Sequence, residues 1–89
     1  ESNDFAKIFY HPVVGQILVL NEENEDGHPA ILFKFKPDSL GVCATKMVFK
    51  DTEEGASICD RVFNEVDESK AVDLVTSAYL KLKETGFLK

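Results

Sequence analysis

The stretch Ala30-Ile-Leu-Phe-Lys-Phe-Lys36 decides the fold class of this chain. Its side chains alternate, so that isoleucine and two phenylalanines share one side while a leucine and two lysines share the other. A period of two residues is typical of a strand with one buried face. The sequence therefore predicts a strand whose aromatic side, with Phe33 and Phe35, lies in the core.

Two more strands are expected next to this one. Gln16–Asn21 is rich in Ile, Leu and Val, and Val42–Lys50 alternates again, while Glu22–Gly27 and Pro37–Gly41 carry turn residues between them. Short connections favour antiparallel pairing of consecutive strands, which gives a meander. The segment Phe5–Tyr10 is a candidate fourth strand, because the proline that follows it is acceptable at a strand boundary.

Beyond Lys50 the pattern is helical. Asp51 lies three residues before Glu54, a spacing typical of a helix N-cap. Two apolar stripes follow at helical spacing, and they are offset from each other by about 100°, so the helix must break near Asp67. The stripes are Ala56, Cys59, Val62, Phe63 and Val66, then Ala71, Leu74, Val75, Ala78 and Leu82. We expect helices over about 52–66 and about 68–85, the second ended by Gly86 with an apolar contact from Phe87.

These elements predict an α+β fold for residues 1–89 as a single small domain: an antiparallel three- or four-stranded meander sheet with two C-terminal helices packed on one face. With 89 residues, the chain has room for one core. The helices are expected to cover the side of the sheet that carries Phe33, Phe35, Met47 and Phe49. A domain of this size buries only about 60 to 65% of its unfolded surface, so a partner or a second copy would add burial.

Composition limits the classes of function. The net charge is −6, which argues against general attraction to nucleic acid or to an anionic membrane, and no apolar run approaches the roughly 18 residues that a membrane span needs. No membrane partner is expected. Two cysteines, Cys43 and Cys59, are too few for a disulfide scaffold and are predicted to be buried thiols of a cytoplasmic protein.

Motifs for catalysis are missing from the sequence. His11, His28 and the two cysteines stand singly, without the short paired spacings of a zinc site, and the chain has no glycine-rich phosphate loop or nucleophile elbow. We therefore expect no catalytic residue, no metal and no cofactor, and the protein is not expected to be an enzyme.

The leading hypothesis is a small acidic, non-enzymatic protein-binding module, accessory or inhibitory, with a second copy of the chain as its simplest partner. The expected contact surface lies on the sheet face away from the helices. It would be covered by the segment 5–14, by a second copy or by another protein, and a dimer is expected to strengthen with salt unless the acids at 22–26 reach the lysines. Its predicted residues are Ile17, Val19, Leu32, Val42, Val48, Lys34, Lys36 and Lys46.

Two alternatives involve nucleic acid. A lysine-rich sheet face could track a phosphate backbone, although the aromatic residues of the central strand alternate onto the opposite side. Conversely, acids of the helices could imitate phosphates and occupy a basic groove on a nucleic-acid enzyme. The residues of this acidic helical face are Glu53, Glu54, Asp60, Glu65, Asp67, Glu68 and Asp73.

Overall fold

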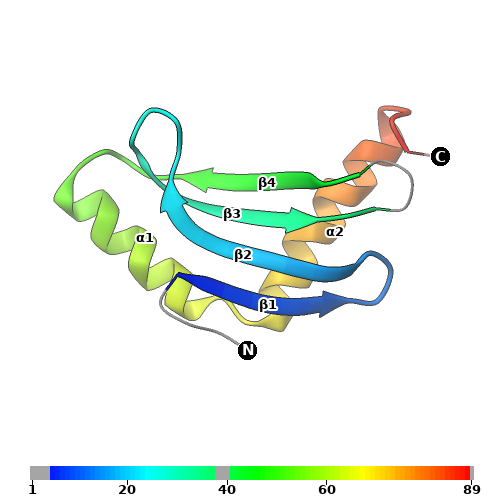
Figure 1. The fold of residues 1–89 in the computed structure, drawn as a ribbon, viewed down its shortest axis with the longest axis horizontal. Coiled ribbons are helices and arrows are strands. Elements are labelled where there is room, and N and C mark those ends of the chain that lie inside the picture. Colours follow the sequence, from blue (N-terminus) through cyan, green and yellow to red (C-terminus); the bar gives the residue numbers. More distant parts are fainter. Residues whose placement is uncertain (1–4, 38–40, 89) are drawn as a thin grey trace.

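The computed structural model of the chain describes residues 5–37 and 41–88. A four-stranded antiparallel sheet in the order β1-β2-β3-β4 comes first along the chain, and two helices follow it (Figure 1). This confirms the α+β class, the meander order and the fourth strand; the predicted turn at 37–41 lies partly outside the described residues. The elements are β1 (Ala6–His11), β2 (Gly15–Glu23), β3 (Pro29–Phe35), β4 (Cys43–Val48), α1 (Glu53–Glu65) and α2 (Glu68–Glu84).

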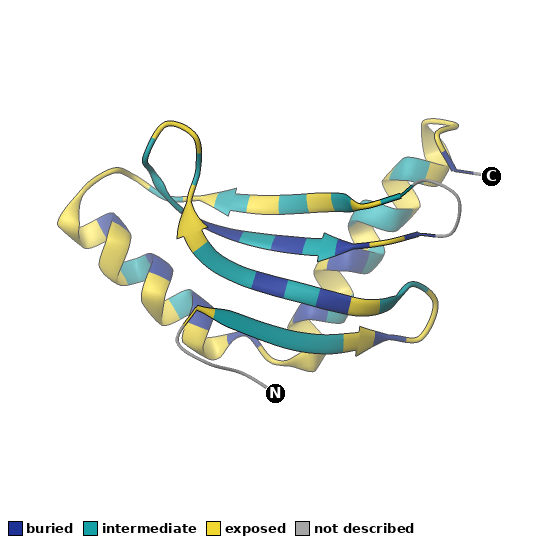
Figure 2. Cartoon of the chain, viewed as in Figure 1, coloured by how far each residue is buried: buried dark blue, intermediate teal, exposed yellow. Residues whose placement is uncertain are grey.

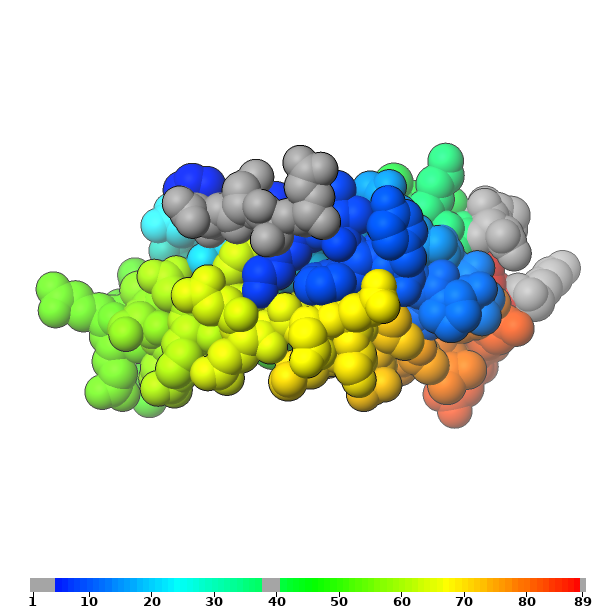
Figure 3. All heavy atoms as spheres, turned by 90° about the horizontal axis from the view of Figure 1, so that it is seen from below, coloured from blue at the N-terminus to red at the C-terminus, as the bar shows by residue number. Residues whose placement is uncertain are grey.

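The molecule has two layers. Both helices lie on the same side of the sheet, which Figure 3 shows from the edge with the strands above and the helices below. The helices diverge from their connection near β1, so that α1 packs under β2 and β3 while α2 contacts all four strands (Figure 1). One face of the sheet is therefore committed to the helices.

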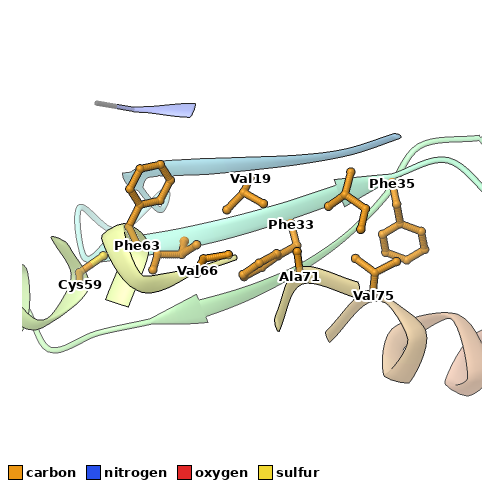
Figure 4. Packing of buried hydrophobic residues seen from close by; sticks show 10 residues of the cluster. Val19, Phe33, Phe35, Cys59, Phe63, Val66, Ala71 and Val75 are labelled. Atoms are coloured by element: carbon orange, nitrogen blue, oxygen red, sulfur yellow. The ribbon is translucent and has the colours of Figure 1, made fainter. Parts of the chain in front are cut away.

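The core forms between these layers. Phe33 and Phe35 of β3 project from the sheet toward Phe63 of α1 and Val75 of α2, and Figure 4 shows these side chains in the space between sheet and helices. Phe33 and Phe63 are each 1% exposed. Met47 packs against this cluster, as the sequence predicts.

The face assigned to β2 is the main correction to the sequence-based model. Ile17 pairs with Phe35 and Val19 pairs with Phe33, so both lie on the helix side and both are 0% exposed. Leucine, isoleucine and valine occupy both sides of β2, and its own alternation does not say which side is buried. Pairing with β3 decides it, and it removes Ile17 and Val19 from the predicted contact surface.

The helical stripes need two smaller corrections. Gly55, rather than Ala56, is buried in the first turn of α1, because this turn lies so close to the Lys50 carbonyl that a β-carbon would overlap it. Leu74 stands at the border of the α2 stripe and is 36% exposed, whereas Ala71 and Val75 are fully buried.

The helix ends follow ordinary capping chemistry. Thr52, not Asp51, is the N-cap of α1, and its hydroxyl oxygen accepts a hydrogen bond from the Gly55 amide at 2.9 Å. Asp67 caps α2, as predicted, by accepting from the Lys70 amide at 2.9 Å. Gly86 has φ of +83° beyond α2, as expected, but the buried apolar residue after it is Leu88 at 7% exposed, since Phe87 is 69% exposed.

Lys7 holds the end of α1, a contact that sequence reasoning missed. Its ammonium donates to the carbonyl oxygens of Phe63 at 2.6 Å, Val66 at 3.0 Å and Asn64 at 3.2 Å. The last turn of α1 has no basic residue of its own. The Phe63 carbonyl also accepts from the Val66 amide at 3.2 Å, so the cation from β1 adds to this capping hydrogen bond and gives the last carbonyls of α1 a charged donor.

Candidate interaction surface on the sheet

The outer face of the sheet, meaning the face turned away from the helices, is the best candidate for a functional surface. Strand register defines its rows: Lys34 lies between Leu18 and Ala44, Leu32 between Leu20 and Lys46, and Ala30 between Glu22 and Val48. The strand β1 adds Ala6, Ile8 and Tyr10 at the edge beside β2.

The middle of the outer face is apolar. Ile8, Leu18, Leu20 and Leu32 are each only partly buried there, and Val48 at the β4 edge is 48% exposed. The segment expected as a cover does not lie over these residues, because it forms β1 and extends the same sheet. Within residues 5–37 and 41–88, no helix lies on this apolar centre as α1 and α2 lie on the other face, and burial along β2 and β3 alternates between buried and intermediate residues (Figure 2).

One end of the outer face carries lysines, and we call it the lysine end. Lys34 and Lys36 border a shallow hollow of about 400 Å³ whose wall also includes Leu18, Gln16 and Val42. Val42 is 71% exposed. The lysine end thus combines two cations with an apolar floor.

The opposite end carries the acidic turn, residues 22–26, which comprises the end of β2 and the first part of its connection to β3. Asn24 shapes it: its side-chain oxygen accepts from the amides of Asp26 at 3.0 Å and His28 at 2.9 Å. Gly27, with φ of +84°, closes the turn. This loop stands out beside the end of β4 in Figure 1.

The acidic turn leans over the outer face. Glu25 forms an ion pair with Lys46 of β4 at 3.6 Å, and a hollow of about 110 Å³ between turn and sheet is lined by Ala30 and Leu32. Ala30 is only 2% exposed, although it belongs to the face without helices. The pKa of Glu25 lies below its ordinary value because a backbone amide hydrogen bond and the Lys46 charge both stabilise its carboxylate.

The structure brings together most residues of the predicted contact surface. Leu32, Val48, Lys34 and Lys46 all lie on the outer face, and Val42 and Lys36 line the hollow at the lysine end. The sequence-based set omitted Ile8, Leu18, Leu20 and Tyr10. A signal in the sequence could have found them. If the buried residues of β3 are taken as fixed, antiparallel pairing across each hairpin shows which alternate residues of β2, and then of β1, lie on the outer face.

The acidic helical face is less of a unit than its composition suggests. Asp67 is the N-cap of α2, Asp60 accepts from the Asn21 side chain at 3.0 Å, and Glu68 accepts from the Tyr10 amide at 3.4 Å. These three acids have partners within the fold. The other four, Glu53, Glu54, Glu65 and Asp73, are exposed on two helices that diverge.

His11 has a structural environment. Its Nδ1 accepts from the amides of Val13 at 3.0 Å and Val14 at 3.2 Å, which leaves the proton on Nε2 to be donated to the Thr76 hydroxyl at 2.7 Å. His11 is only 7% exposed. Both nitrogens therefore hold the β1–β2 turn against α2.

The other soft ligands lie apart. Cys43 starts β4, His28 lies in the β2–β3 turn at the opposite end of the sheet, and Cys59 lies in α1 with its thiol 3.6 Å from the Asn21 side-chain oxygen. Both cysteines are free thiols. Burial raises the pKa of Cys59, and the nearby negative charge of Asp60 raises it further. Over the described part of the chain, no three His, Cys, Asp or Glu residues are grouped to hold a metal ion.

Neither α1 nor α2, the helices of the described residues, has the length and apolar character to cross a membrane. Comparison of the chain with protein-family models, with curated proteins and with solved structures found no match in any of the three.

Proposed function

We propose that this protein is a small acidic, non-enzymatic binding module that acts by protein contact, as an accessory or inhibitory subunit, and that its contact surface is the outer face of the sheet. The observation that carries the proposal is the apolar centre of Ile8, Leu18, Leu20 and Leu32, which stays partly exposed between the lysine end and the acidic turn. An apolar centre with a charged rim is the composition expected of a protein contact surface.

The environments of His11 and Cys59 support a non-enzymatic function. A general base needs a ring nitrogen free to take a proton, and both nitrogens of His11 are engaged. A thiol nucleophile needs a lowered pKa, and burial moves the pKa of Cys59 in the opposite direction.

A site-specific photocrosslinker tests the location of the surface. Placed at Leu18 or Leu32 in protein added to lysate of the native host, it is expected to join a protein partner, whereas the same group at Ser77 on the exposed side of α2 is expected to give none. The partner is then purified and titrated, and Leu32→Glu is expected to weaken its binding at least about tenfold. Crosslinks from Ser77 alone would contradict the proposal.

Nucleic-acid binding is the second candidate, and Tyr10 is the observation that favours it. Tyr10 is 63% exposed on the outer face and pairs with Gln16 at the lysine end, so an aromatic ring and two lysines share one end of the sheet. Stacking on an aromatic ring with cations nearby is how single strands are bound. Oligonucleotide binding that falls with salt and with Tyr10→Ala would support this function, and no binding at 50 mM salt would reject it.

A further inference from the structure

The charges of the outer face are segregated along the strand direction. The lysine end lies at the level of Lys34, the acidic turn adjoins the level of Ala30, and Leu32 lies midway between them on β3. Four residues of strand separate these two levels by about 13 Å. The face is thus positive at one end and negative at the other, and its middle is apolar apart from Lys46 at the β4 edge, which is paired with Glu25.

The two charged ends also differ in shape. The acidic turn leans over the outer face, as the Glu25–Lys46 ion pair and the buried Ala30 show, so it forms the raised end. The lysine end is hollowed by about 400 Å³. The raised end and the hollow lie at opposite ends of the same two strands, because the turn lies between β2 and β3 and the hollow is lined in part by Gln16 and Leu18 of β2 and Lys34 of β3.

We propose that a second copy of this chain occupies the outer face, with each acidic turn seated in the lysine-bordered hollow of the other copy. A two-fold axis running across the strands at the level of Leu20 and Leu32 reverses the strand direction, so it places each acidic turn over a lysine end and each apolar centre over the other. The contact between an acidic turn and a lysine end is then formed twice. This inference rests on the proposed use of the outer face.

The competing orientation lacks this complementarity. A two-fold axis parallel to the strands would put the lysine end of one copy over the lysine end of the other, and the acidic turns would also meet. The sequence alone led to the expectation that salt would strengthen a dimer by screening its lysines. The structure places the acids at the opposite end of the same face, and this reverses the expected sign: salt weakens the dimer.

The size of the face sets the expected affinity. Four strands about 4.8 Å apart and about six residues long give a face of roughly 400 Å² in projection. Stable specific interfaces bury about 800 Å² on each partner. The dimer is therefore expected to be weak, with half of the chains associated at a concentration of about 100 μM. Its two sheets are expected to cross at an angle of about 30°, which is typical of sheet packing.

Charge reversal tests the arrangement by sedimentation equilibrium up to about 500 μM at several salt concentrations. One variant carries Lys34→Glu and Lys36→Glu, and a second carries Glu22→Lys and Asp26→Lys, which leaves the Glu25–Lys46 ion pair intact. A control variant carries Lys81→Glu and Lys83→Glu on α2. Each replacement of a lysine by glutamate changes the net charge by −2, so the net charges of the control and of the first variant both change from −6 to −10.

The expected results follow from the two-fold arrangement. Wild type and control dimerise and weaken as salt rises, and each outer-face variant associates at least about tenfold more weakly. An equimolar mixture of the two variants regains part of the association as a heterodimer. The acidic turn of the first variant then faces the intact lysine end of the second, and residues 22–26 of the second change in charge from −4 to 0 and no longer repel the acidic end of the first. Circular dichroism confirms that each variant remains folded.

Three outcomes would overturn the proposal: a monomeric wild type at 500 μM, a dimer that both outer-face variants leave unchanged, or a dimer that salt strengthens. The crosslinking experiment separates these results from failure of the proposed function. A monomer that still crosslinks another protein from Leu18 or Leu32 rejects the second copy and keeps the contact surface. A chain that crosslinks nothing from these positions rejects both.

Discussion

Replacing Lys7 with methionine tests the contact that joins β1 to the end of α1. The change keeps an apolar stem of similar length and removes an ammonium that donates to three carbonyl oxygens at 2.6 to 3.2 Å. It also removes a cation 4.9 Å from the centre of the Phe63 ring. Hydrogen bonds that involve a charged group contribute about 1.5 to 3 kcal/mol, and a cation at a helix C-terminus contributes about 0.3 to 1 kcal/mol.

Water can reach part of this site because Asn64 is exposed, so water can replace some of the hydrogen bonds that the carbonyl oxygens lose. We therefore expect Lys7→Met to lower the free energy of unfolding by about 2 kcal/mol, which corresponds to roughly 8 to 16 °C in melting temperature for a domain of this size. Urea unfolding followed by circular dichroism gives the free energy, and a thermal melt gives the temperature.

Lys70→Met is the matched control for Lys7→Met. Lys70 pairs with Asp67 at 3.4 Å across an exposed surface where both side chains are 61% accessible, and such pairs contribute about 0 to 1 kcal/mol. The control is expected to change stability by less than about 0.5 kcal/mol. If Lys7→Met were as harmless as the control, Lys7 would not be holding the end of α1.

Four other predictions address the core, a close backbone approach, a cap and a thiol. Phe63→Ala is expected to cost about 3 to 5 kcal/mol, and an unchanged melting curve would contradict the core assignment. Gly55→Ala should destabilise α1 although alanine favours helices, because the added carbon meets the Lys50 carbonyl; a gain in stability would refute that contact. A hydrogen bond from a backbone amide lowers the pKa of Asp67 from its ordinary value of 3.8. The Asp67 carboxylate therefore stabilises the fold above about pH 4, and this stabilisation is lost as the pH falls through the lowered pKa. The stability of Asp67→Asn should lack this loss on acidification, and an unchanged pH dependence would contradict the role of the cap. Native Cys59 should react with a thiol reagent at pH 7 far more slowly than the other cysteine, and equal rates would argue against its burial.

The sequence by itself determined β2, β3, β4 and both helices and their order, while β1 was expected only as a candidate fourth strand. Alternation in β3 and β4 identified strands, and the shift between the two helical stripes at Asp67 placed the break between α1 and α2. These signals are local, because a repeat of two or of 3.6 residues and a capping side chain act within a few residues of chain. For the same reason the aromatic residues Phe33 and Phe35 could be assigned to the core in advance.

Only the tertiary structure decided which side of β2 is buried and what lies on the outer face. The sequence of β2 is apolar on both sides, so Ile17 and Leu18 are equivalent until pairing with Phe35 and Lys34 separates them. The contact of Lys7 with the end of α1 joins residues more than fifty positions apart, and no local pattern marks it. Strand register and long-range packing depend on the contacts between the whole sheet and its helices. For this reason the apolar centre, the lysine end and the acidic turn form one surface only in the folded chain.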